Sequence, residues 1–118
     1  MEVHNKTRNR VLGTSVRTAR GVAARMRGLL RTESLPEGEG LWIRPCSCIH
    51  SVGMKYAFDA LFIDRSMTVV GACERFPRNR VSRIFPSADG VLELPAGMIA
   101  KSGTRIGDVV EFRAARFR

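Results

Sequence analysis

Residues 59–74 read DALFIDRSMTVVGACE, and this stretch contains the clearest local structural signal in the chain. One apolar run ends at Ile63, a second starts at Met67, and a short polar segment separates them. Two such runs joined by a tight polar turn are typical of a β-hairpin. We expect the carboxylate of Asp64 to start the turn by accepting hydrogen bonds from nearby backbone amides.

On both sides of this hairpin, short apolar segments are bounded by glycine and proline, which is typical of strands. The predicted strands are RVLGTSVRT at 10–18, LWIRP at 41–45, SCIHSVGM at 47–54, GVLELPAG at 90–97 and GDVVEFRAA at 107–115. Gly13 suggests a bend in the first of them, and a single helical turn that ends at Gly103 is expected between the last two. The arginine-rich segment RFPRNRVSRIFPSADG at 75–90 is predicted to be a long loop, either functional or mobile.

The segment TARGVAARMRGLLRTESL at 18–35 has a different periodicity. Its apolar residues recur at spacings of three and four, and most of its arginines fall on the other faces, which predicts an amphipathic helix. Thr18 is a suitable N-cap, and Pro36 and Gly38 would end the helix. The apolar positions are Val22, Ala23, Met26, Leu29 and Leu30.

Strands that follow one another without alternating helices favour an antiparallel sheet. We therefore predict an α+β, mostly β fold: a small antiparallel β-barrel or curled sheet with one packed amphipathic helix. The 118 residues suit a single domain over 1–118, with a core at about 10–112 and a basic tail at 113–118.

The chain is strongly basic, with 20 Lys and Arg against 11 Asp and Glu and a formal net charge of +9. This excess favours a polyanionic partner. No apolar stretch approaches the roughly 20 residues of a membrane-spanning helix. The polar first residues do not resemble a secretory leader, so a cytoplasmic location and reduced cysteines are expected.

The order of several motifs resembles the DUF192 family, also known as UPF0127, a group of small bacterial and archaeal proteins of unknown function. The resemblance runs from about Arg20 to Phe112. It rests on RMRGLL, on GLWIRPCSCIHSVGMKYAFDALFIDRSMTVV, on VLELPAG and on GDVVEF. The family's signature positions correspond here to His50, Met54, Lys55, Asp59 and Asp64, with Leu92 to Gly97 and Gly107 to Asp108 further on. The resemblance implies a compact β-rich fold with a helix and implies no activity. Many relatives carry an envelope leader.

Two chemical sites are conceivable around Cys46, Cys48 and His50. If this segment is a strand, the three side chains share one face and are weak candidates for a metal site, although the spacing is not the one zinc usually takes. Cys48 and His50 also suit a nucleophile and base pair, but no oxyanion hole or orienting residue is recognisable. Small buried thiols and a hydrogen-bonded histidine are the structural alternative, and no cofactor is expected.

A binding pocket is the third possibility. We predict ligand-binding roles for His50, Lys55, Asp59, Arg75, Arg78 and Arg80, in a polar cleft with the loop from Arg75 to Arg83 as a mobile wall. The sequence therefore favours a non-enzymatic binding or accessory module for an anionic small molecule or an acidic protein surface. The alternatives are an enzyme that uses His50 as general base or in a Cys-His pair, and a nonspecific nucleic-acid-binding protein. The oligomeric state stays open.

Overall fold

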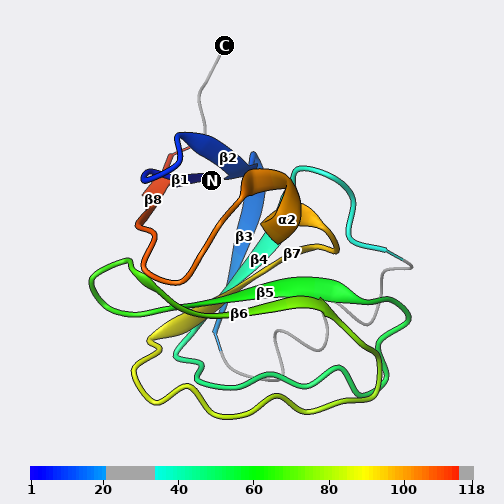
Figure 1. Cartoon of the computed structure of the whole chain (residues 1–118). Coiled ribbons are helices and arrows are strands. Elements are labelled where there is room, and N and C mark those ends of the chain that lie inside the picture. Colours follow the sequence, from blue (N-terminus) through cyan, green and yellow to red (C-terminus); the bar gives the residue numbers. More distant parts are fainter. Residues whose placement is uncertain (21–33, 115–118) are drawn as a thin grey trace.

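The computed structural model describes residues 1–20 and 34–114 (Figure 1). Within these residues the chain forms eight strands, in two sheets, and one short helix. The elements are β1 (Glu2–Asn5), β2 (Arg10–Gly13), β3 (Ser15–Arg20), β4 (Glu39–Arg44), β5 (Phe58–Ile63), β6 (Val69–Phe76), β7 (Gly90–Pro95), α2 (Met98–Ser102) and β8 (Val110–Arg113). Among the described residues, no helix has the length and apolar character needed to cross a membrane.

The larger sheet has the strand order β3-β4-β7-β5-β6, and the smaller sheet has the order β2-β1-β8. Pairing is antiparallel throughout the described strands except between β3 and β4, which run parallel with Ser15 opposite Glu39. The mostly β prediction is confirmed. The predicted barrel is not, because the described strands form two separate sheets.

The hairpin predicted from residues 59–74 is confirmed as β5 and β6, which pair from Phe58 opposite Phe76 to Ile63 opposite Val69. Asp64 Oδ1 accepts hydrogen bonds from the backbone amides of Ser66 and Thr68, each at 2.9 Å. The turn therefore has the chemistry that the sequence indicated.

The central strands β5 and β7 of the larger sheet are buried on both faces, which explains why they are apolar almost without interruption. Because side chains alternate along a strand, Leu61 and Ile63 face one hydrophobic cluster, which also contains residues of the smaller sheet such as Val3. Phe58 and Phe62 face a second cluster, which also contains Ile49 and Phe85 from the loops before β5 and after β6. The core thus lies on both sides of one sheet.

The short helix α2 is confirmed where the sequence predicted a helical turn. It ends at Gly103, which adopts the left-handed conformation (φ 68°) that glycine accommodates at a helix C-terminus. Its N-terminus is capped from another element, because the Ile99 amide donates to Asp59 Oδ2 at 2.7 Å.

Two sequence predictions are wrong, one lies largely outside the described residues, and one strand was not predicted. Most of the helix predicted at 18–35 lies outside the described residues, but Thr18 lies within β3 and is no N-cap. Residues 47–54 form a loop and not a strand. The strand β1 was missed, because its residues EVHN contain a single apolar residue and its pairing with β8 joins opposite ends of the chain.

Candidate functional site

Residues 46–54 form a loop because Ser51 turns inward and bonds to another segment. The buried Ser51 donates its amide to the Arg80 carbonyl oxygen at 2.9 Å and its hydroxyl to the Pro77 carbonyl oxygen. Its Oγ accepts the Arg80 amide at 3.0 Å. A serine side chain that satisfies backbone groups in this way competes with regular strand pairing. The backbone pairing of His50 with Val81 is an isolated antiparallel β-bridge and does not extend into a strand.

The loop at 77–89 lies against the loop at 46–54. The Ser82 amide donates to the Ile49 carbonyl oxygen at 2.8 Å, and the Ile49 amide donates to Ser82 Oγ at 2.9 Å. Figure 1 shows the two loops side by side along the lower edge of the molecule, remote from the sheet of β1, β2 and β8.

Phe85 fixes the end of this loop on the larger sheet. Its ring stacks on Phe62 with 4.0 Å between centroids and lies over Gly71, where a Cβ atom would be 2.3 Å from the ring. Hydrogen bonds and a buried aromatic ring thus hold the loop against the neighbouring loop and the larger sheet. The mobility predicted for residues 75–83 stays a prediction.

Four exposed cations lie on these loops: Lys55, Arg78, Arg80 and Arg83. We call residues 50–55 and 78–84 the two-loop surface. Residues 44–58 and 75–88 contain no aspartate or glutamate, and in the described part of the chain no carboxylate pairs with the three arginines. A cation–π contact also positions Arg83, because its guanidinium lies 4.2 Å from the centroid of the Phe85 ring. Three arginines without a carboxylate partner in the described residues create a local positive potential.

The structure separates two of the predicted site residues from this surface. Asp59 is completely buried and accepts the Arg75 amide at 2.8 Å on Oδ1 and the Ile99 amide on Oδ2. The Arg75 guanidinium lies beside Gly97, just before α2. Asp59 and Arg75 thus join β5, β6 and α2. The remaining predicted residues, namely His50, Lys55, Arg78 and Arg80, come from the two-loop surface, with His50 half-buried.

The thiols are not arranged as a metal site. Cys48 is exposed, whereas Cys46 is half-buried and donates its Sγ–H to the Cys48 carbonyl oxygen at 3.0 Å. Cys73 lies on β6, and burial raises the pKa of its thiol despite the lowering effect of Arg83. Across residues 1–20 and 34–114, no group of three or more His, Cys, Asp or Glu side chains is placed to hold a metal ion.

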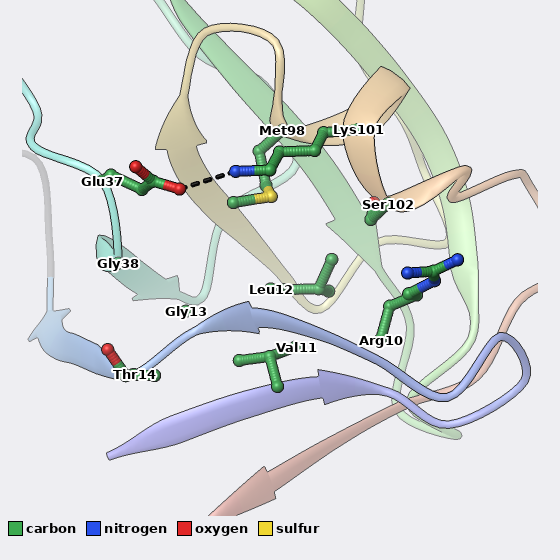
Figure 2. Close-up of a pocket in the computed structure, with 10 residues that line it drawn as sticks. All are labelled: Arg10, Val11, Leu12, Gly13, Thr14, Glu37, Gly38, Met98, Lys101 and Ser102. Carbon is green, nitrogen blue, oxygen red and sulfur yellow. Dashed lines mark hydrogen bonds and ion pairs between the residues drawn. The ribbon is translucent and has the colours of Figure 1, made fainter.

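A hollow of about 540 Å³ lies between β2, the turn at Glu37 and Gly38, and α2. In Figure 2, Lys101 and Met98 extend from α2 toward Glu37, and Lys101 Nζ donates to Glu37 Oε1 at 2.6 Å. Arg10 and Leu12 rise toward α2 from β2. No local sequence pattern indicates this hollow, because its lining comes from three segments that are distant in the chain.

Beside α2 lies a buried polar network that contains Asp108, a position in the Gly-Asp motif. Asn5 Nδ2 donates to Asp108 Oδ2 at 3.0 Å and to Thr104 Oγ1 at 2.9 Å, and Arg8 Nε donates to Asp108 Oδ2 at 2.9 Å. Burial by itself raises the pKa of Asp108, but hydrogen bonds from Arg8, Asn5 and the Arg105 amide, together with the Arg8 charge, lower it to about 2. This carboxylate is held as an anion by its partners and ties β1 to the segment before β8.

Residues 3–112 match the model of the DUF192 family, whose description reads "Uncharacterized ACR, COG1430". The chain therefore belongs to the DUF192 family.

Two crystal structures have the same fold. A protein of unknown function from Novosphingobium aromaticivorans DSM 12444 is similar with a TM-score of 0.81 and 22% identity, over 95% of this chain and 84% of that one. A putative transcription regulator from Sinorhizobium meliloti 1021 is similar with a TM-score of 0.76 and 21% identity, over 93% of this chain and 89% of that one. The search of curated proteins gives no significant match. At these identities the likeness concerns the fold alone.

Proposed function

We propose that the protein is a non-enzymatic binding module that docks an anionic partner on the two-loop surface. The observation that carries this proposal is the absence of any aspartate or glutamate from residues 44–58 and 75–88, which together contain six Lys and Arg. Of these six, Arg44 pairs with Asp89 and Arg75 lies beside Gly97, so Lys55, Arg78, Arg80 and Arg83 form the surface. Elsewhere in the chain the charges are mixed, and Arg8 and Lys101 each pair with a carboxylate.

The fixed backbone of the two loops supports this role. Because Ser51 and Phe85 hold the loops, the arginines extend from an ordered support, and less backbone entropy is lost when a partner binds. Arginine forms two parallel hydrogen bonds to a phosphate or carboxylate, so Arg78, Arg80 and Arg83 suit a partner that bears several such groups.

Nucleic acid is a polyanion of this kind, and one of the similar structures is described as a putative transcription regulator. The two-loop surface nevertheless has no exposed aromatic side chain on which a base could stack, since Phe85 is buried and Tyr56 half-buried. This argues against single-stranded nucleic acid as the partner. Duplex DNA, whose bases are already stacked, is included as a second probe in the test.

The test uses labelled heparin as a general polyanion and a labelled DNA duplex as a second probe, and it measures binding by fluorescence anisotropy over a range of salt concentrations. The triple variant Arg78→Ala, Arg80→Ala, Arg83→Ala is compared with the control Arg10→Ala, Arg17→Ala, Arg105→Ala. The control loses the same charge from exposed positions elsewhere. We expect the first variant to bind at least about tenfold more weakly and with a flatter salt dependence, because fewer counterions are released.

Equal weakening in both triple variants would refute the proposal, because binding would then depend only on the net charge of the protein. Lys55→Ala provides a second measurement on the other loop, and we expect a smaller loss in the same direction. No loss with Lys55→Ala would restrict the surface to the loop at 77–89.

A further inference from the structure

Exposed aliphatic side chains lie among the cations of the two-loop surface. Val52 is 53% exposed, Val81 is 69% exposed and Ile84 is 62% exposed. These are three of the six large hydrophobic residues that are exposed within the described part of the chain. Apolar side chains kept in water on an ordered surface often mark an interaction site.

The order of residues on the second loop alternates these two chemistries. Residues 80–84 read RVSRI, so that each of the two arginines is directly followed by an aliphatic residue. Their exposure does not result from a loose loop, because the Arg80 amide bonds to Ser51 Oγ and the Ser82 amide bonds to the Ile49 carbonyl oxygen. The fold thus presents Val81 and Ile84 to solvent on a fixed backbone.

The combination discriminates between kinds of anionic partner. A soluble anion or a duplex phosphate backbone would bind the arginines, but exposed valine and isoleucine would add little to its binding free energy. A protein interface usually has tryptophan or tyrosine at its centre, and the exposed side chains here include neither. With an anionic lipid surface, both the arginines and the aliphatic side chains would contribute to binding. The aliphatic side chains would enter the interfacial region, and the cations would remain at the lipid phosphates.

We propose that the two-loop surface is a peripheral docking site for an anionic membrane, with Val81 and Ile84 inserted among the lipid headgroups and Arg78, Arg80 and Arg83 on the phosphates. This inference rests on the proposed function and names its partner. Val52 and Lys55 on the neighbouring loop extend the same surface.

The experiment measures sedimentation of the full chain with vesicles of phosphatidylcholine, with and without phosphatidylglycerol. Two double variants are compared: Val81→Ser, Ile84→Ser on the surface, and Val11→Ser, Ile106→Ser as a control. The control removes side chains that are 46% and 67% exposed but lie on other elements. Circular dichroism confirms that each variant is folded.

We expect binding to the anionic vesicles only, and about tenfold weaker binding of the surface variant. We expect the control variant to bind the vesicles as the unmodified protein does. We also expect the surface variant to keep its affinity for heparin. Removal of Arg80 and Arg83 together is expected to weaken vesicle binding by about fivefold for each charge.

Each contrary outcome identifies which proposal fails. If the protein binds heparin but not the anionic vesicles, the membrane inference is overturned and the proposed function stands. If vesicle binding depends on the arginines but not on Val81 and Ile84, the insertion is refuted. Tighter binding to duplex DNA than to vesicles would point to a nucleic-acid partner, and the absence of binding to any polyanion would overturn both proposals.

Discussion

The Asp108 network and the two-loop surface treat charge in opposite ways. At Asp108, an almost fully buried carboxylate is bonded to Arg8, Asn5 and the Arg105 amide, so every partner is supplied from within the chain. On the two-loop surface, Arg78, Arg80 and Arg83 are exposed without a carboxylate partner in the described chain. A charge that is satisfied internally holds elements together, whereas a cluster left unsatisfied is available to a partner.

The first way to test this comparison is to release the loop without changing its charge. Phe85→Ala removes the ring that stacks on Phe62 and is expected to lower the free energy of unfolding by about 3 kcal/mol. Urea denaturation followed by circular dichroism measures this change. We also expect weaker heparin binding under conditions in which the variant is folded, because the arginines lose their support. Unchanged heparin binding would show that the charges alone suffice.

The second test removes the carboxylate at the centre of the Asp108 network. Asp108→Ala removes one of the two acceptors of Asn5 Nδ2 and the acceptor of the Arg105 amide, and it is expected to cost about 2–3 kcal/mol of unfolding free energy. Glu111→Ala on the adjacent strand is the matched control, because it also removes a carboxylate but from a partly exposed pair with Arg113. We expect heparin binding to survive Asp108→Ala. A control that destabilises as strongly would contradict the structural role given to Asp108.

The pH dependence of stability gives a smaller effect in the same region. Hydrogen bonds depress the pKa of Asp108 from 3.8 to about 2 in the folded protein. Its stabilisation is therefore complete above about pH 5 and is lost as pH falls toward 2, because the unfolded carboxylate takes up its proton first. We expect the ionised Asp108 to contribute about 1–2 kcal/mol to the free energy of unfolding. Solvent screening at the partly exposed Arg8 keeps this contribution below the full value of the pKa shift. Urea denaturation between pH 5 and 2 should show a weaker decline in Asp108→Ala, and identical profiles would refute the assignment.

The smallest effect is expected at the hollow beside α2. Lys101 and Glu37 form a close ion pair, drawn in Figure 2, but both side chains are largely exposed. Solvent screening makes such pairs weak, so Lys101→Ala is expected to leave the urea midpoint unchanged. A shift as large as that of Asp108→Ala would show that this pair is structural and that exposure is a poor guide to the role of a charge in this protein.

Much of the fold could be predicted from local sequence. The hairpin from Phe58 to Phe76 was recognisable because its strands are apolar and Asp64 forms its turn with neighbouring residues. The helical turn that ends at Gly103 was predicted for the same reason. In the candidate site, the basic loop was identified by its arginine content, and Lys55 was identified by its place in the family signature and near His50 in the sequence. The role of Asp59 could not be, because its partners at residues 75 and 99 are distant in the chain.

The sequence by itself therefore determined the positions of most strands, the excess of positive charge and the acid-free segments, since these depend on neighbouring residues and on counting. Only the tertiary structure decided which charges are satisfied. It turned residues 47–54 from a predicted strand into a loop through the bonds of Ser51 to Pro77 and Arg80. It also placed Val81 and Ile84 in solvent while Phe85, next in the chain, was buried. The physical reason is that burial and hydrogen bonding between distant segments depend on how the sheets pack, which no local pattern specifies.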